Sequence, residues 1–148
     1  MSYFVCIGLS KSDVDLSKNH DELIFREATN SPIGQRLSAN GKYIPFFVLS
    51  DGSSEEILGK GRKRKSRVAQ FHHLLNELQE RRSYFNLLVH IFRGDVTTEE
   101  VEVKSKTKIS IAKIVHAFPE IDLDVLYSVI PAEKAATDTA NRDTPIPF

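Results

Sequence analysis

The chain has 148 residues, of which 41% are hydrophobic and 27% are charged, and its formal net charge is zero. This length and composition are typical of one globular domain that can bury its own core. The single cysteine, Cys6, excludes an internal disulfide framework and a multi-cysteine zinc site, which suits the reducing cytoplasm where we expect this protein. The first residues carry no basic secretion signal, and no apolar run approaches the roughly 18 residues of a membrane span, so we expect neither secretion nor membrane insertion.

The first forty residues are expected to form one strand, one helix and a turn-rich connection. The apolar run at 3–9 predicts a buried strand. Residues 20–28 place apolar side chains at helical spacing, which favours a short helix with Asn19 as its cap. The segment 30–42 carries several glycine, proline and asparagine turn signals and is predicted to be a series of turns.

The middle of the chain predicts a strand, a short return and the longest helix. Residues 43–49 are predicted to be a strand, and residues 55–58 its short hairpin partner. From about Arg67 to Arg82, apolar residues recur on one face of a helix, with Ser66 as a plausible N-cap.

The remaining segment of the domain predicts further strands. Alternating residues at 84–92 indicate a largely buried strand. The alternation is sustained over 99–114, which predicts one long strand or a hairpin bent near Ser105. Residues 121–129 alternate strictly and predict a final strand, although Pro119 at a first helical position would also suit a helix.

These elements predict an α+β domain over residues 1–131. We expect a strongly curved antiparallel sheet with one long amphipathic helix packed on it. The order of the elements is compatible with a five-stranded OB-like barrel that bears insertions. After Pro131 the composition changes to Ala, Thr, Asp and Asn, which predicts a disordered C-terminal tail at 132–148.

Positive charge is concentrated in one short segment at the start of the longest predicted helix. Between residues 60 and 67 the chain carries six cations and no acid: Lys60, Arg62, Lys63, Arg64, Lys65 and Arg67. A helix N-terminus already carries partial positive charge and free N–H groups, so an anion is expected to compensate the cations. The segment therefore predicts contacts with the phosphates of a nucleic acid, and a solvated loop or a protein-docking patch are the alternatives.

A row of lysines in the predicted strand at 99–114 is the second basic feature: Lys104, Lys106 and Lys108. Side chains spaced by two residues share one face of a strand, so this row could extend the path of a nucleic-acid backbone. Lysines on an edge strand also prevent sheet-to-sheet aggregation, which is the alternative. Single-strand binding would also use exposed rings on which bases stack, but we expect most of the chain's rings in the core. The candidate rings are Tyr43, Tyr84, His90 and Phe92.

The longest predicted helix carries one candidate metal site. His73 and Glu77 are four residues apart and could share the metal ion of a small hydrolase. They lie opposite the apolar stripe, which is typical of a solvated surface. No glycine-rich phosphate loop or nucleophile motif with its expected context is present in the sequence, so we expect a binding protein without cofactor or metal rather than an enzyme.

The last seven residues, Arg142 to Phe148, combine two prolines with a terminal phenylalanine and carboxylate. Proline fixes φ, so less entropy is lost when such an end is captured by a protein. The ending resembles the acidic tail of bacterial single-stranded-DNA-binding proteins, which finishes in Asp-Ile-Pro-Phe and docks on replication and repair enzymes. Ile146, Pro147 and Phe148 match, whereas Pro145 replaces the Asp and residues 132–148 carry a net charge of only −1. The resemblance implies that these three matching residues bind a protein partner.

The sequence as a whole favours a cytoplasmic nucleic-acid-associated protein. We expect it to bind single-stranded DNA as an accessory of replication or repair, while its tail recruits a protein. One alternative is a protein–protein interaction module, such as an inhibitor, immunity or adaptor protein of a phage or mobile element. The other is the small metal-dependent hydrolase. The sequence indicates neither an oligomeric state nor the identity of the partner.

Overall fold

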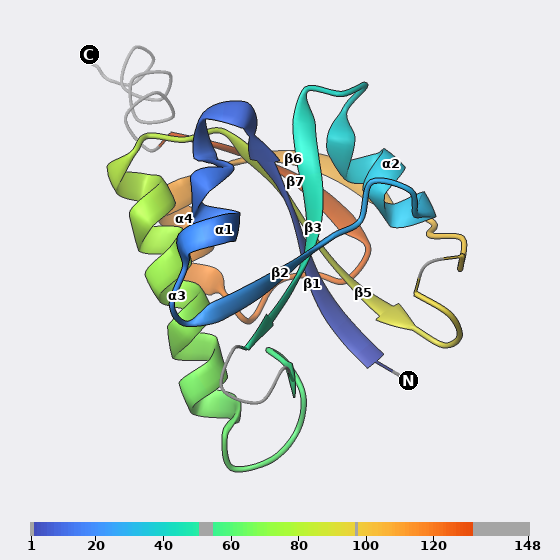
Figure 1. The fold of residues 1–148 in the computed structure, drawn as a ribbon, viewed down its shortest axis with the longest axis horizontal. Helices are drawn as coiled ribbons and strands as arrows, with labels where there is room; N and C mark the ends of the chain where they lie inside the picture. Colours follow the sequence, from blue (N-terminus) through green and yellow to red (C-terminus); the bar gives the residue numbers. More distant parts are fainter. Residues whose placement is uncertain (1, 51–54, 97, 132–148) are drawn as a thin grey trace, which may run out of the picture.

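A β-sheet with helices on both faces organises the chain in our computed structural model, which describes residues 2–50, 55–96 and 98–131 (Figure 1). In chain order the elements are β1 (Ser2–Ser10), the 3-10 turn η1 (Lys11–Asp13), α1 (Asp15–Asn19), β2 (Leu23–Glu27), α2 (Pro32–Ser38), β3 (Tyr43–Ser50), β4 (Glu55–Glu56), α3 (Arg64–Glu80), β5 (Phe85–Phe92), β6 (Ser105–Ser110), α4 (Ile111–Ala117) and β7 (Val125–Ile130). The predicted α+β class is confirmed.

The sheet is open rather than closed into a barrel. Its strands lie in the order β2-β3-β1-β5-β7-β6, and the two-residue β4 pairs with β3. All of these pairs are antiparallel except β6 and β7, which are parallel. Parallel neighbours need a crossover connection, and α4 supplies it here. The predicted OB-like barrel and purely antiparallel sheet are therefore not found, and β2 and β6 form the edges of the described sheet.

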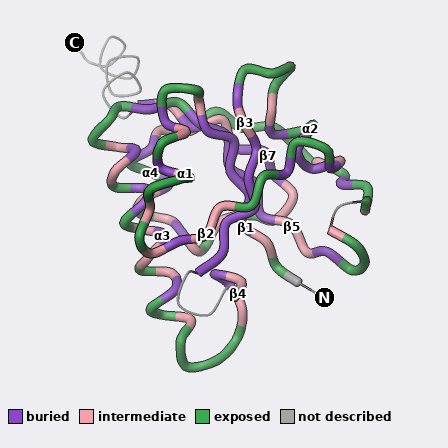
Figure 2. The backbone as a smooth tube through the Cα atoms, in the orientation of Figure 1, coloured by how far each residue is buried: buried purple, intermediate pink, exposed green. Residues whose placement is uncertain are grey.

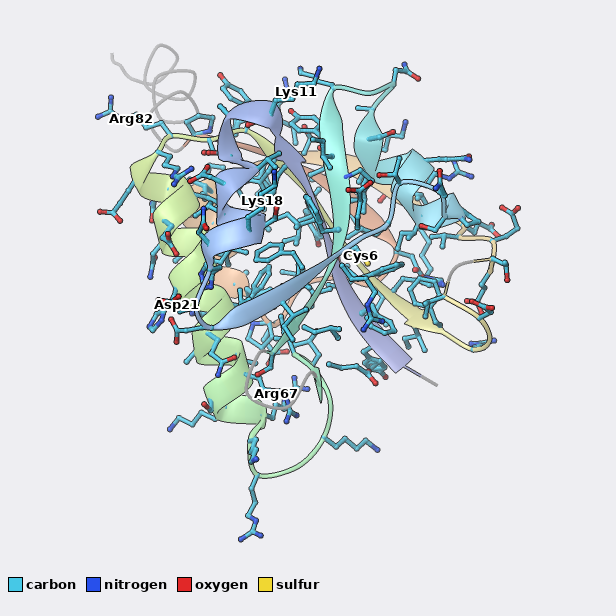
Figure 3. All side chains as sticks on the ribbon, in the orientation of Figure 1. Cys6, Lys11, Lys18, Asp21, Arg67 and Arg82 are labelled. Carbon is cyan, nitrogen blue, oxygen red and sulfur yellow. The ribbon has the colours of Figure 1, made fainter. Side chains whose placement is uncertain are left out.

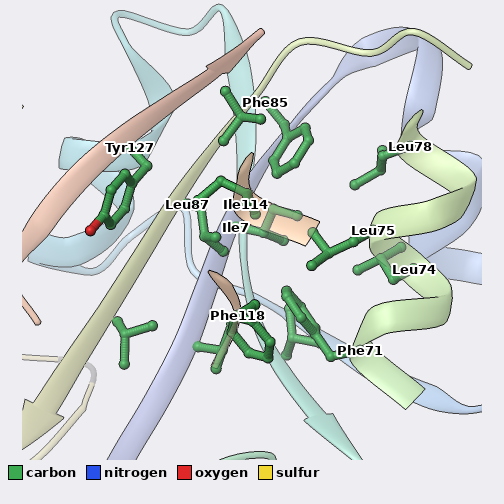
Figure 4. Packing of buried hydrophobic residues seen from close by; sticks show 14 of the residues in the cluster. Ile7, Phe71, Leu74, Leu75, Leu78, Phe85, Leu87, Ile114, Phe118 and Tyr127 are labelled. Carbon is green, nitrogen blue, oxygen red and sulfur yellow. The ribbon is translucent and has the colours of Figure 1, made fainter. Parts of the chain in front are cut away.

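The long helix α3 packs on one face of the sheet together with α1 and α4 (Figure 1). Leu74, Leu75 and Leu78 of α3 are fully buried, and the ring of Phe71 lies against that of Phe118 with centroids 4.7 Å apart. Figure 4 shows these side chains interleaved with side chains of the central strands. Full burial of each such side chain contributes about 1.5–3 kcal/mol, so this apolar face accounts for the position of the helix.

The opposite face of the sheet is covered by α2, whose Ile33 and Leu37 are fully buried. This helix lies close to the backbone of the central strand β1. A methyl group on Gly8 of β1 would lie only 2.7 Å from the carbonyl oxygen of Leu37 in α2. The buried Asn86 of β5 donates a hydrogen bond from Nδ2 to the same oxygen at 2.9 Å. The absence of a side chain at Gly8 and the hydrogen bond from Asn86 therefore allow α2 to pack directly on the sheet.

Most of the predicted strands and the long helix are confirmed with changed bounds. The strands predicted at 3–9, 43–49, 55–58, 84–92 and 121–129 correspond to β1, β3, β4, β5 and β7. The last of them begins at Val125, four residues later than predicted. The long helix begins at Arg64, and Lys63 rather than Ser66 occupies its N-cap position.

Two predictions for the first half of the chain are wrong. The segment expected to be helical at 20–28 contains strand β2, because it gains a run of antiparallel pairs with β3 that its helical spacing could not reveal. The segment expected to be turns at 30–42 contains helix α2. At the start of this helix, the side chain of Ser31 accepts the backbone N–H of Gly34 at 3.2 Å, and Pro32 occupies the first helical position.

The long strand predicted at 99–114 is wrong for most of its length. Only β6 is a strand there, and the chain then enters helix α4. Ser110 caps that helix by accepting the backbone N–H of Lys113 at 3.4 Å. Ile111 and Ile114 are both buried in the core at helical spacing, so the alternation of apolar residues gave the wrong period. The prediction of one long helix packed on the sheet is corrected, because α1, α2 and α4 pack on it as well.

Candidate functional site

The predicted basic segment divides into two groups of side chains. Arg64 and Arg67 turn inward: Arg64 Nη1 donates to the carbonyl oxygen of Leu58 at 2.7 Å. Arg67 Nη2 donates to the carbonyl oxygens of Gly59 and the following residue at 2.6 and 3.2 Å. Arg67 is only 2% exposed, and Figure 3 places it at the base of the loop. The two arginines therefore bind three successive carbonyl groups and fix the path of the loop.

The other four cations of the segment are exposed, and we call them the basic loop: Lys60, Arg62, Lys63 and Lys65. Figure 2 shows this loop on the outside of the molecule, between β4 and α3. None of the four makes an ion pair within the described part of the chain. The first turn of α3 contains no acid, so the positive end of the helix dipole adds to their field. The arrangement concentrates uncompensated positive charge on one exposed surface.

A cavity of about 470 Å³ opens beside the basic loop. It lies where β1 departs from β3: their pairing begins at Val5, and β4 pairs with the end of β3 instead. We call this cavity the basic pocket, because three cations and one acid are among the described residues that line it. These residues are Phe4, Arg26, Leu49, Glu56, Gly59, Lys60 and Arg67.

The lysine row predicted to extend the nucleic-acid path lies at the opposite edge of the sheet. Lys104, Lys106 and Lys108 are exposed in β6 and immediately before it. In the sheet order, β7, β5 and β1 separate β6 from the strands next to the basic loop. The structure therefore does not join the two basic surfaces, and a strand of nucleic acid that contacts both must cross the sheet.

The candidate stacking rings are mostly buried, as predicted. Phe92 is 1% exposed and Tyr43 is 7% exposed, and His90 is partly buried. Burial raises the pKa of Tyr43, and the neighbouring Tyr84 raises it further, so Tyr43 stays protonated at neutral pH. Tyr84 is 39% exposed and is the one ring of this set that offers a surface to a base.

The two candidate metal ligands bind different partners. His73 Nδ1 lies 2.6 Å from Glu22 Oε1, and Glu77 Oε1 lies 3.0 Å from His20 Nε2. Both partners belong to the connection between α1 and β2, so the pairs join this connection to α3. Within residues 2–50, 55–96 and 98–131, no three His, Cys, Asp or Glu side chains are arranged so that they could hold one metal ion, and the hydrolase alternative gains no support from the geometry.

A three-residue cluster that the sequence analysis did not find joins β5 to two later segments. His90 Nδ1 lies 2.5 Å from Asp124 Oδ1, and its Nε2 lies 3.1 Å from Glu99 Oε2. The other oxygen of Glu99 accepts the backbone N–H groups of Arg93 and Gly94 at 2.9 and 2.7 Å. The two carboxylates are 34 and 9 residues from His90 along the chain, so no local spacing could have indicated the cluster.

A bidentate ion pair ties the first helix to the end of α3. Arg81 donates from Nη1 and Nη2 to the two carboxylate oxygens of Asp15 at 2.8 and 2.7 Å. Arg81 Nη1 also lies 3.3 Å from the buried Asp13. These hydrogen bonds raise the pKa of Arg81, and the bond from Arg81 holds the pKa of Asp15 below its ordinary value although some burial opposes this.

Replacing Asp15 with asparagine is expected to lower the free energy of unfolding at pH 7 and to lower it less at pH 3. Because the pKa of Asp15 is depressed in the folded protein, its carboxylate stabilises the fold above its unfolded value of about 4. That contribution is lost as the pH falls through the folded value. Urea unfolding of both proteins at the two pH values measures it, with Asp21→Asn as a control for an exposed carboxylate. An equal difference at both pH values would contradict the prediction.

The predicted partner-binding residues Ile146, Pro147 and Phe148 lie outside the described residues, as does the whole predicted tail at 132–148. Their role therefore stays a prediction. Among the described helices the longest, α3, has 17 residues, and none has the length and apolar character that crossing a membrane requires.

The chain cannot be assigned to a family by comparison with known proteins. No protein-family model, no curated protein and no solved structure matches it. Its function must therefore be inferred from its own residues, of which the basic loop and the basic pocket are the most concentrated charged features.

Proposed function

We propose that this protein binds single-stranded nucleic acid through the basic loop. The supporting observation is that Lys60, Arg62, Lys63 and Lys65 are exposed around the N-terminus of α3 without an ion pair in the described residues. Cations of this kind bind phosphates and release the counterions of the nucleic acid, which gives affinity without base specificity. Arg64 and Arg67 act differently, since their side chains hold the carbonyl groups of the loop.

The dependence of binding on salt tests this function. The four phosphate contacts of the basic loop contribute about −3 to the slope of log affinity against log salt concentration, and this part alone makes binding about 50-fold weaker at 200 mM than at 50 mM salt. Fluorescence anisotropy with a labelled single-stranded oligonucleotide measures the slope. Absence of binding at the lowest salt would exclude the function and would favour the alternative, a module whose basic loop meets an acidic protein surface.

The lysine row and the C-terminal residues have secondary roles in the proposal. Lys104, Lys106 and Lys108 extend the contact to the far edge of the sheet, so replacing all three with glutamine reduces the slope in the same assay by about 2. The segment from Ile146 to Phe148 recruits a protein of replication or repair. Deleting residues 145–148 removes that partner from a pull-down and leaves the affinity for the oligonucleotide unchanged.

A further inference from the structure

The basic pocket has a shape that differs from that of an open basic surface. It is a concave space of about 470 Å³ whose walls come from strands β1, β2, β3 and β4, the following loop and helix α3. Leu49 is buried and Phe4 is partly buried, so part of the lining is apolar. Such a recess admits the end of a chain or a small molecule, whereas the middle of a nucleic-acid backbone would lie across its mouth.

Cations from three separate elements line this recess. Arg26 comes from β2, Lys60 from the loop and Arg67 from α3, and the side chains of Arg26 and Lys60 are exposed and can reach an entering group. The acid among the described lining residues is Glu56, whose Oε1 accepts the backbone N–H of Tyr3 at 2.6 Å. This bond directs the carboxylate toward β1, so the described walls favour an anion.

The position of Lys60 at the rim is fixed before any ligand arrives. Its carbonyl oxygen and that of Gly59 are both held by Arg67, and Gly59 N–H donates to the carbonyl oxygen of Glu56 at 3.2 Å. A methyl group on Gly59 would lie 3.4 Å from Arg67 Nη2 and 3.3 Å from that same oxygen, so the loop already packs tightly against the arginine. Less entropy is then lost when an anion binds, because the backbone that carries Lys60 is already ordered.

We infer that the basic pocket binds a terminal phosphate, the phosphomonoester at the end of a nucleic-acid strand. Such a group carries a charge of about −1.5 to −2 at neutral pH and three acceptor oxygens, which suits converging cations better than a backbone diester with one charge. The apolar part of the lining is suited to the adjoining sugar and base. The inference rests on the proposed function, since the next phosphates of the same strand would follow the basic loop out of the pocket.

The test compares oligonucleotides of one sequence whose end carries either a phosphate or a hydroxyl group, with each end of the strand examined in turn. One of the two ends should bind about tenfold more tightly with a phosphate than with a hydroxyl, as expected for one strong charge-assisted contact. In Arg26→Gln this ratio falls toward one. Lys11→Gln removes an exposed cation at the opposite end of the molecule (Figure 3) and keeps the ratio. Arg62→Gln weakens both oligonucleotides and also keeps the ratio.

Two further probes separate failure of the pocket from failure of the proposed function. Thymidine monophosphate competes for the pocket if a free nucleotide suffices, and inorganic phosphate alone shifts the NMR signals of Gly59 and Lys60. Equal binding of the phosphate and hydroxyl ends overturns the pocket while leaving strand binding intact. If no oligonucleotide binds but inorganic phosphate shifts these two signals, the proposed function fails, and the pocket is a phosphate site that does not receive the end of a nucleic-acid strand. No response to any of these probes overturns both.

Discussion

Replacing Gly34 with alanine is expected to lower the free energy of unfolding by about 3 kcal/mol or more. A methyl group on Gly34 would lie 1.8 Å from the carbonyl oxygen of Ala28 and 2.7 Å from its carbon. That oxygen cannot move away freely, because it accepts both the backbone N–H of Ser31 at 3.1 Å and its hydroxyl at 2.7 Å. The substitution therefore separates the start of α2 from the end of β2 and loosens the apolar cluster beneath the helix.

Chemical denaturation of the wild type and the variant measures this effect. Since a domain of this size is stable by only about 5–15 kcal/mol, the variant should also unfold at a clearly lower temperature. Gly94→Ala is the matched control, because a methyl group there lies 3.5 Å from Glu99 Oε1, an ordinary contact. It should change the stability by no more than about 0.5 kcal/mol. Equal stability of the two variants would show that α2 does not approach β2 as described.

Replacing all four cations of the basic loop with glutamine is expected to weaken oligonucleotide binding by at least about 100-fold at low salt. Each cation that contacts a phosphate contributes to the salt dependence, so the slope should also fall by about 3. The fold should be retained, because Lys60, Arg62, Lys63 and Lys65 are exposed and contribute no side-chain bond within the described residues. Anisotropy titrations at several salt concentrations provide both quantities.

The control for this variant removes the same number of positive charges from other parts of the surface. Replacing Lys11, Lys18, Arg36 and Lys113 with glutamine also removes four exposed cations, but from η1, α1, α2 and α4. This control should lose little affinity if the basic loop makes the phosphate contacts. Equal losses in the two variants would mean that binding responds to net charge alone, and the basic loop would then have no special role.

The sequence alone was sufficient to predict those helices and strands whose pattern of apolar residues lies within one continuous segment. The apolar stripe of α3 reflects burial of one face of the helix, and the nearly continuous apolar run of β5 reflects burial on both faces of the sheet; both elements were predicted close to their observed bounds. The prediction of a helix in the segment that forms β2 failed because its partner strand β3 lies about 20 residues further along the chain. Pairing with that strand overrides the helical spacing of the apolar residues. The prediction for α4 failed because Ile109 and Ile111 continue the strand alternation into the first residue of the helix, and the helical spacing rests on Ile111 and Ile114 alone.

The candidate site was only partly predictable for a related reason. The six cations between residues 60 and 67 are visible in the sequence, but nothing local distinguishes Arg64 and Arg67, which hold carbonyl groups, from their exposed neighbours. Arg26 reaches the basic pocket only because β2 pairs with β3, and that pairing was missed. The partners of His90 are likewise brought together by tertiary structure alone.

The central place of β1 has a consequence for how the chain is made. This strand is synthesised before the other elements of the domain, yet its two neighbours are β3 and β5, and its pairing with β5 joins Ser2 to Phe92. The apolar stretch from Phe4 to Leu9 must therefore wait for most of the domain to be synthesised before both of its edges are covered. Such long-range pairing slows folding and leaves an apolar, aggregation-prone segment of the nascent chain exposed. Folding of this domain in cells should therefore depend on chaperones more than its modest size suggests.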